Sequence, residues 1–190
     1  MRKSYHHGDA RSALIAAGLK HLETTPATEL SLRQVAETAG LSRQAPYRHF
    51  ADKEDLLAAL AEAGFEELTR RIGAATGAAG DAEAALAAAA ETYIAFAREL
   101  PQRFRLMFSR ELVDLARFPA AAAAGAAAFA VLARIVAAAV GEERAADRAL
   151  AAWALVHGYA ALAIELEVEA SDRLTNRARQ FAQLIAASEA

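Results

Sequence analysis

Two helical patterns joined across a glycine, within residues 31–55, constrain the fold more than any other stretch of this chain. Ser31 is a good helix N-cap, and Gln34 completes a capping box three residues later. Apolar residues then recur with helical spacing until Gly40, which supplies the left-handed residue that often follows the last turn of a helix. The sequence therefore predicts a short helix up to this glycine, a tight turn, and a second helix over 42–49.

The second predicted helix carries polar, cationic and aromatic side chains. Arg43 and Tyr47 are four residues apart, so they share a side of a helix. Gln44 and Arg48 repeat this spacing, which makes the face broad. Arginine can read guanine and glutamine can read adenine in a major groove, each good contact giving about 1–3 kcal/mol of discrimination. This pattern is typical of a helix–turn–helix, in which the first residues of the second helix contact base edges.

We assign two roles within this region. Some side chains would contact base edges, including the methyl group of an alanine against a thymine methyl. Others would contact phosphates, which position a protein without reading sequence. The predicted base-reading residues are Arg33, Arg43, Gln44, Ala45 and Arg48. The predicted phosphate-contacting residues are Ser31, Ser42, Tyr47, His49 and Lys53.

Pro46 falls inside the predicted second helix. Its missing N–H would have bonded the Ser42 carbonyl in the first turn, so we expect a far smaller cost than for a proline in mid-helix. Helical pairs separated by glycine are also common in other all-α proteins, and a polar face with two arginines is usually just solvated. From spacing alone, DNA binding and a solvated helix pair are equally open.

The distribution of charge favours DNA binding more than the total does. The net charge is −3, but residues 1–53 hold 8 Lys and Arg against 5 Asp and Glu. The remaining residues hold 13 against 19. A cationic head on an acidic body is expected when only the head meets phosphate.

An alanine-rich composition with only 4 prolines favours an all-α protein, and 190 residues suffice for one or two small domains. The chain has no cysteine, which excludes disulfides and thiol chemistry and suits the cytoplasm. Its apolar runs are alanine-rich and interrupted by charge, so we expect no membrane span. Helical periodicity and caps predict about nine helices, at 9–22, 31–39, 42–49, 52–71, 81–100, 101 to about 112, 119–140, 143–168 and from 171 or 172 onward.

Aromatic side chains recur at helical spacing in the second half of the chain. They could line an apolar pocket, although such residues are more often plain core. His157, on an apolar face, is likewise more often a structural histidine than a ligand contact. The candidate pocket residues are Tyr93, Phe96, Phe104, Met107, Phe108, Phe129, Trp153 and His157.

Several of these motifs together resemble the TetR (tetracycline repressor) family of transcriptional regulators. Tyr-Arg-His-Phe at 47–50 follows Ala-Gly-Leu-Ser at 39–42 and precedes Asp-Lys-Glu-Asp-Leu-Leu at 52–57, and Ser-Leu-Arg-Gln-Val-Ala at 31–36 fits the same signature. The resemblance covers roughly residues 8–60. A shorter one lies at Trp153 and His157-Gly158, which resemble the Trp/His-Gly C-terminal domain of one TetR subgroup.

The resemblance implies an N-terminal three-helix DNA-binding domain, 1–52, and a helical effector-binding and dimerisation domain, 53–190. It implies a homodimer that binds a palindromic operator, and a small-molecule effector, most such proteins being repressors released by ligand. The last two helices would pair with those of a second copy, although their apolar stripes would also suit a monomer core. The dimer residues so implied are Leu150, Ala161, Ile164, Leu174, Ala178, Phe181 and Ile185.

Signatures of catalysis are missing from the sequence. There is no GxSxG, GxGxxG, phosphate loop or HExxH motif, so we predict no enzyme, no cofactor and no metal site. The alternative to a regulator is a helical small-molecule-binding or scaffold protein with a non-functional DNA-binding head. That alternative predicts a dimer and a ligand without salt-dependent, sequence-specific DNA binding.

Overall fold

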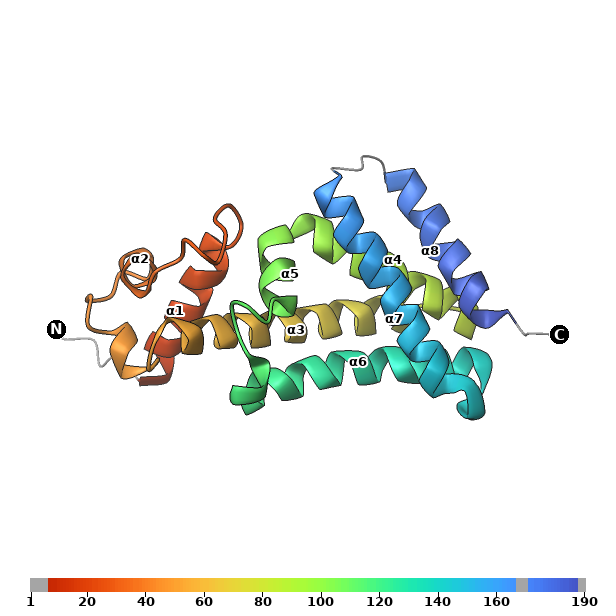
Figure 1. Cartoon of the computed structure of the whole chain (residues 1–190), viewed down its shortest axis with the longest axis horizontal. Coiled ribbons are helices and arrows are strands. Elements are labelled where there is room, and N and C mark those ends of the chain that lie inside the picture. Colours follow the sequence, from red (N-terminus) through yellow and green to blue (C-terminus); the bar gives the residue numbers. More distant parts are fainter. Residues whose placement is uncertain (1–6, 167–170, 188–190) are drawn as a thin grey trace. The chain divides into compact units, whose positions relative to one another are not determined.

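The computed structural model describes residues 7–166 and 171–187, and the side chains of 10–166 and 176–187 (Figure 1). Over these residues the secondary structure is entirely helical, which confirms the predicted all-α class. The α-helices are α1 (His7–His21), α2 (Leu32–Thr38), α3 (Lys53–Gly77), α4 (Ala82–Glu99), α5 (Pro101–Phe108), α6 (Pro119–Val140), α7 (Glu142–Glu165) and α8 (Ser171–Ala186), with 3-10 helices η1 (Pro46–Arg48) and η2 (Leu115–Arg117).

The chain folds into two compact units, each made of two chain segments. Unit 1 comprises Met1–Gly64 and Gln102–Ala123, and unit 2 comprises Phe65–Pro101 and Ala124–Ala190. Helix α5 and the loop after it therefore belong with the N-terminal helices. The functional division at 52/53 stays a prediction, because compactness and function need not divide a chain at the same place.

Unit 1 is held by a small apolar core between its helices. Leu14 of α1, Leu22 directly after that helix, Val35 of α2 and Leu60 of α3 are almost completely buried. Phe50, at the end of the segment that follows α2, is 2% exposed and belongs to the core of the same unit. Helix α1 also approaches α3 closely, because a Cβ atom on its Gly18 would meet the Leu60 side chain at 2.8 Å.

Two helix-interior glycines differ in what surrounds them. A Cβ atom on Gly64 in unit 1 would lie 2.6 Å from the sulfur of Met107, whose side chain is buried. A Cβ atom on Gly125 in unit 2 would meet the Phe65 ring at 3.5 Å, an ordinary van der Waals contact. Only the first glycine is therefore required by close packing, here between α3 and α5.

We expect Gly64→Ala to destabilise the protein and Gly125→Ala to stabilise it. Overpacking a core costs about 1–3 kcal/mol, which exceeds the gain of up to about 1 kcal/mol from alanine's better helix propensity. At Gly125 only the propensity gain applies. Thermal denaturation of both variants would test this, and equal shifts in Tm would contradict the packing argument.

Unit 2 is built on α4, α7 and α8, which pack against one another. The buried face of α7 consists of five alanines and one valine: Ala145, Ala149, Ala152, Val156, Ala160 and Ala163. Leu86 of α4, Val136 and Val140 of α6, and Ala182 and Ile185 of α8 complete a core with two of these alanines. Small side chains on α7 allow neighbouring helices to approach closely, which explains how an alanine-rich chain makes a core.

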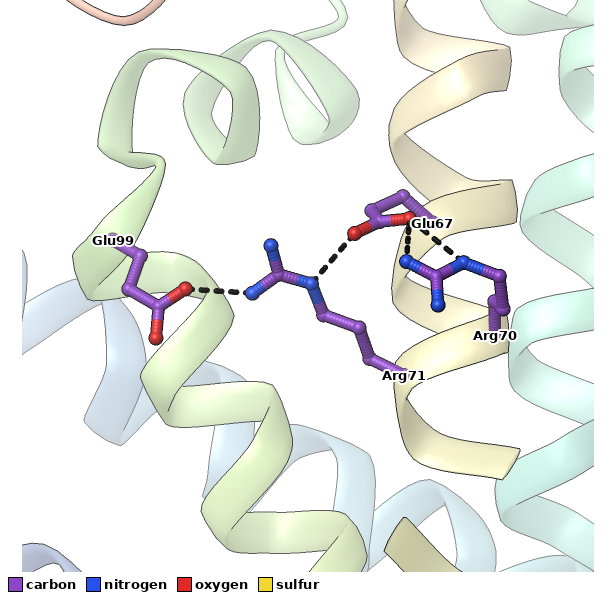
Figure 2. Close-up of polar contacts among 4 residues, drawn as sticks. All are labelled: Glu67, Arg70, Arg71 and Glu99. Carbon is purple, nitrogen blue, oxygen red and sulfur yellow. Dashed lines mark hydrogen bonds and ion pairs between the residues drawn. The ribbon is translucent and has the colours of Figure 1, made fainter. Parts of the chain in front are cut away.

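A charged network joins α3 to α4 within unit 2 (Figure 2). The Arg71 guanidinium donates to Glu67 at 2.8 Å and to Glu99 at 2.6 Å, and it lies 5.5 Å from the Phe96 ring centroid. Partial burial alone would raise the pKa of Glu67, but hydrogen bonds from Arg71 and Arg70 outweigh it and hold that pKa below its usual value. The network is largely exposed, so it orients α3 and α4 more than it stabilises them.

The ends of three helices differ from those predicted. Helix α3 continues to Gly77 instead of ending near Arg71, because an interior glycine costs a helix only about 1 kcal/mol. Helix α5 ends at Phe108, where the Ser109 N–H turns to the carbonyl of Leu106. Helix α7 ends at Glu165, before the predicted 168.

Helix α6 is long and apolar enough, by length and composition, to cross a membrane, alone among the described helices. Most of it is not buried within the chain. A single helix of this kind is weak evidence, since length and composition do not place a helix in a bilayer. The expectation of no membrane span therefore stays a prediction.

Candidate nucleic-acid interface

The start and end of α2 are fixed by the local chemistry predicted from the sequence. The Ser31 hydroxyl oxygen accepts the Gln34 N–H at 3.3 Å, and the Ser31 O–H donates to the Gln34 side chain. At the other end Gly40 has φ +67°, while the N–H groups of Gly40 and Leu41 bond to Glu37 and Ala36. These are the two hydrogen bonds of a Schellman motif. The predicted N-cap at Ser31 and the glycine turn are confirmed, while the Gln34 side chain bonds to the Ser31 hydroxyl instead of to the Ser31 N–H that a full capping box uses.

The predicted helix over 42–49 is wrong. The Ser42 carbonyl accepts the Ala45 N–H at 2.9 Å, three residues on, and η1 covers only Pro46–Arg48. Because Pro46 has no N–H, it cannot make the i→i+4 bond to Ser42 that would start an α-helix there. The cost of Pro46 to the helix is larger than we expected. The predicted helix spans only two turns, so the loss of one hydrogen bond in its first turn prevents the helix.

The segment 42–50 is nevertheless anchored at defined points. Pro46 is buried, and the Phe50 N–H bonds to the Pro46 carbonyl at 2.8 Å. The Arg11 guanidinium lies 5.5 Å from the centroid of the buried Phe50 ring. A hydrogen bond of 2.8 Å between His21 Nε2 and Thr38 Oγ1 also ties α1 to α2. A short, non-α-helical segment is thus held between fixed ends.

All ten residues predicted to contact DNA are described, and none of them is buried. Tyr47, at 58%, is the most exposed large apolar side chain among the described residues of unit 1. The Lys53 ammonium group donates to the Thr28 carbonyl at 2.6 Å, which draws it toward the loop before α2 while leaving two N–H donors. Exposed to solvent are Arg33, Ser42, Arg43, Gln44, Tyr47 and Arg48, and partly exposed are Ser31, Ala45, His49 and Lys53.

The candidate pocket residues fall into both units. Phe104, Met107 and Phe108 lie in unit 1, where the Phe104 and Phe108 rings are 5.0 Å apart. Unit 2 holds Phe96, which is fully buried, and an aromatic cluster. That aromatic cluster comprises Tyr93, Phe129, Trp153 and His157.

Hydrogen bonds run through the aromatic cluster. The Tyr93 hydroxyl lies 2.8 Å from His157 Nδ1 and also bonds to Trp153, whose indole can only donate. Each group has a partner if the indole N–H donates to Tyr93 and the Tyr93 O–H donates to an unprotonated His157 Nδ1. Burial raises the pKa of the Tyr93 hydroxyl, with the Trp153 hydrogen bond opposing in part, and burial lowers the pKa of His157. Both shifts favour the neutral groups.

We expect His157 to make the protein less stable in mild acid. Its pKa is lowered in the folded state from 6.5, so below that pH the unfolded chain binds the proton first and the free energy of unfolding falls until the folded pKa is passed. His157→Asn keeps a hydrogen-bond acceptor but cannot titrate. Urea midpoints of both proteins above and below pH 6.5 should therefore fall more in the wild type, and parallel falls would contradict the role of His157.

The residues predicted for a dimer interface have different surroundings in the single chain. Ala178 and Ile185 are buried within unit 2, whereas Leu150 is 57% exposed. Three leucines that were not among the predicted residues, Leu162, Leu166 and Leu184, are 59%, 68% and 61% exposed in the single chain. Ala161, Ile164 and Phe181 are partly buried, and the side chain of Leu174 lies outside the described residues.

Two family models match this chain, one over its N-terminal helices and one over its C-terminal helices. Residues 14–60 match the family model "Bacterial regulatory proteins, tetR family". Residues 86–187, more than half of the chain, match the model "Tetracyclin repressor-like, C-terminal domain". The chain belongs to the TetR family. It is therefore a DNA-binding transcriptional regulator and not an enzyme.

Solved structures of other proteins share the fold of this TetR-family regulator. A protein of unknown function from Rhodococcus sp. RHA1 is 36% identical, with a TM-score of 0.81, over 98% of this chain and 100% of that one. A tetR-family regulatory protein from Rhodococcus RHA1 is 17% identical (TM-score 0.70; 95% and 98% covered). The multidrug binding protein EbrR, complexed with imidazole, is 20% identical (TM-score 0.65; 95% and 96% covered). No curated protein matches.

Proposed function

We propose that this TetR-family regulator binds a palindromic operator as a homodimer and acts as a repressor that a small molecule releases. The observation that carries the proposal is the exposed array of Arg43, Gln44, Tyr47 and Arg48, held between a capped helix and the buried Phe50. Such side chains suit base edges and phosphates. A regulator of this kind would work in the cytoplasm, without a membrane.

The exposed leucines of α7 and α8 support a homodimer. Leu162 of α7 and Leu166, the residue that follows this helix, lie four residues apart, and Gly158, four residues before Leu162, has open space where a side chain would be. An exposed leucine pair next to a glycine suits close packing of a second helix. We place the centre of the interface on this α7 face and on Leu184 of α8, in addition to the residues predicted from the sequence.

The aromatic cluster of unit 2 supports an effector that has both apolar surface and a hydrogen-bonding group. Rings from α4, α6 and α7 meet there around a polar Tyr93–His157 pair. EbrR, with the same fold, is a multidrug binding protein. We assign the C-terminal domain to the Trp/His-Gly subgroup on Trp153, His157 and Gly158, and we retain all eight candidate pocket residues.

Selection from a random double-stranded DNA library tests the proposed function. The purified protein would be incubated with the library at near-physiological salt, and the retained DNA sequenced. We expect a two-fold symmetric site, because a homodimer presents two identical heads. Enrichment of no sequence, with or without added cell extract as a source of effector, would contradict it.

Variants in the head should separate base reading from phosphate contact. We expect Arg43→Ala and Gln44→Ala to relax base preference by about 1–3 kcal/mol at one position of the site. Lys53→Ala should weaken binding to all sequences and reduce the dependence of affinity on salt by about one unit. Titrations against the selected site and single-base variants of it would measure both effects. Unchanged base preference in both Arg43→Ala and Gln44→Ala would contradict the assignment of these two residues as base-reading residues.

One observation favours the alternative, a helical binding or scaffold protein with a non-functional head. The segment that should enter the major groove forms only the short helix η1. On this alternative the protein would still dimerise and bind a small molecule. DNA binding would then be weak and show no preferred sequence.

A further inference from the structure

The first turn of α3 is a junction at which three consecutive side chains hold three different parts of unit 1. Successive residues of a helix point about 100° apart, so Lys53, Glu54 and Asp55 diverge from one another. Each of these side chains has a hydrogen-bond partner outside its own helix. The junction stands immediately after the DNA-reading segment.

Two of the three side chains hold the DNA-binding head. Asp55 Oδ2 accepts the N–H of Ala51, the residue that follows Phe50, at 2.9 Å. Asp52 Oδ1 accepts the Asp55 N–H at 2.9 Å in return, which makes a reciprocal cap. The Lys53 ammonium group donates to the Thr28 carbonyl in the loop before α2. Any tilt of this turn therefore displaces both ends of the helix–turn–helix.

The third side chain holds a segment sixty residues away in sequence. Glu54 Oε2 accepts from Arg117 Nη1 at 2.6 Å, and Glu54 Oε1 accepts the backbone N–H of Asp114 at 3.3 Å. Asp114 also caps η2 by accepting the Ala116 N–H, so the contacted loop has a defined conformation. Glu54 thus connects the loop between α5 and α6, residues 109–118, to the head.

This loop is part of the unit that contains the head. Leu106 and Met107 just before it, and Val113 within it, are buried in unit 1. The Arg117 side chain is 61% exposed, so its ion pair with Glu54 adds little to stability. An exposed pair that joins two otherwise well-packed parts is better suited to fixing their relative position.

We propose that Glu54 is a positioning residue that couples the 109–118 loop to the DNA-reading segment through the first turn of α3. The proposal deepens the proposed function, because the loop would then be a route by which the state of the C-terminal helices changes operator affinity. A movement of the loop would tilt the first turn of α3, because Arg117 and the Asp114 N–H both bond to Glu54. Lys53 and Asp55 would transmit this tilt to Thr28 and Ala51.

Arg117→Gln tests the coupling without touching α3. Glu54→Gln is the reciprocal variant, and the two together complete a double-mutant cycle. Arg70→Gln is the control, because it removes an exposed arginine from an ion pair within α3, in unit 2, that joins no other segment. With the operator found by selection, we expect each of the first two variants to change the Kd by about three- to tenfold in the same direction. The double variant should change it no further, and the control should match the wild type.

Amide hydrogen exchange supplies a readout that needs no DNA. In full-length Arg117→Gln we expect faster exchange in peptides covering 27–30 and 50–53, as well as in the altered loop. Faster exchange confined to 109–118 would overturn the proposal, as would single effects on Kd that multiply in the double variant. If the wild type selects no DNA site, the proposed function fails, and the exchange pattern alone then decides whether Glu54 couples the loop to the head.

Discussion

Glutamate in place of Leu162 is expected to convert the proposed homodimer into a monomer. The side chain is 59% exposed in the single chain and lies beside Leu166, which is 68% exposed. Two-fold symmetry would place two new carboxylates in the interface, one from each subunit, and burying an unpaired charge costs several kcal/mol. We expect the dimer dissociation constant to rise by on the order of 100-fold or more, with a corresponding loss of operator affinity. Light scattering across a dilution series would measure it.

Leu150→Glu is the comparison variant, because Leu150 is equally exposed and lies on the same helix, but belongs to the residues predicted from the sequence and not to the proposed centre of the interface. It is twelve residues from Leu162, which places it about a third of a turn away around the axis. Dissociation by Leu150→Glu alone would assign the interface to the stripe predicted from the sequence. Dimers in both variants would contradict any interface centred on α7.

Removal of the Phe50 ring is expected to cost about 3–5 kcal/mol of the stability of unit 1. The ring is 2% exposed, so Phe50→Ala would leave a cavity at the end of the segment 42–50 and also remove the contact with Arg11. Circular dichroism in urea reports on helices of both units. Trp153, the only tryptophan of the chain, reports on unit 2. We expect the helical signal to fall at a lower urea concentration than in the wild type and before the tryptophan signal changes.

Phe129→Ala serves as the control for the loss of a phenylalanine ring. Its side chain is 39% exposed and contacts Trp153 at a centroid distance of 5.8 Å, so its removal should cost far less. Equal losses in the two variants would show that Phe50 has no special role in the core. An unchanged unfolding midpoint in Phe50→Ala would contradict the packing described for unit 1.

Features set by neighbours in sequence could be predicted from the sequence alone. The cap at Ser31, the turn at Gly40 and the all-α class depend on hydrogen bonds and propensities within a few residues. The family was also recognisable, because the motifs around the helix–turn–helix are dense. Within that same region, Pro46 overrode the helical spacing, since two turns offer too few i→i+4 bonds to absorb a missing donor.

Features set by packing between distant segments could not be predicted. On α7 we followed the large side chains, from Leu150 to Ile164, whereas the buried face consists mainly of alanines. Alanine contributes almost nothing to the apolar periodicity of a sequence. In a helix whose buried face is made of alanines, the periodicity therefore follows the leucines, even where these are exposed. The contact of Glu54 with Arg117 had no signal either, because an acidic residue in the first turn of a helix is expected for local reasons.

The division of unit 1 into two chain segments has a consequence for engineering. Exchange of DNA specificity between related regulators usually treats the head as a module that can be cut out at one point. Here residues 102–123 are packed with the N-terminal helices, and Met107 fills the space beside Gly64. A graft that moves the N-terminal helices alone would leave a mismatched surface on α5. A faithful chimera must carry both segments, and recipients with a bulkier residue at the position of Gly64 would reject the donor's α5.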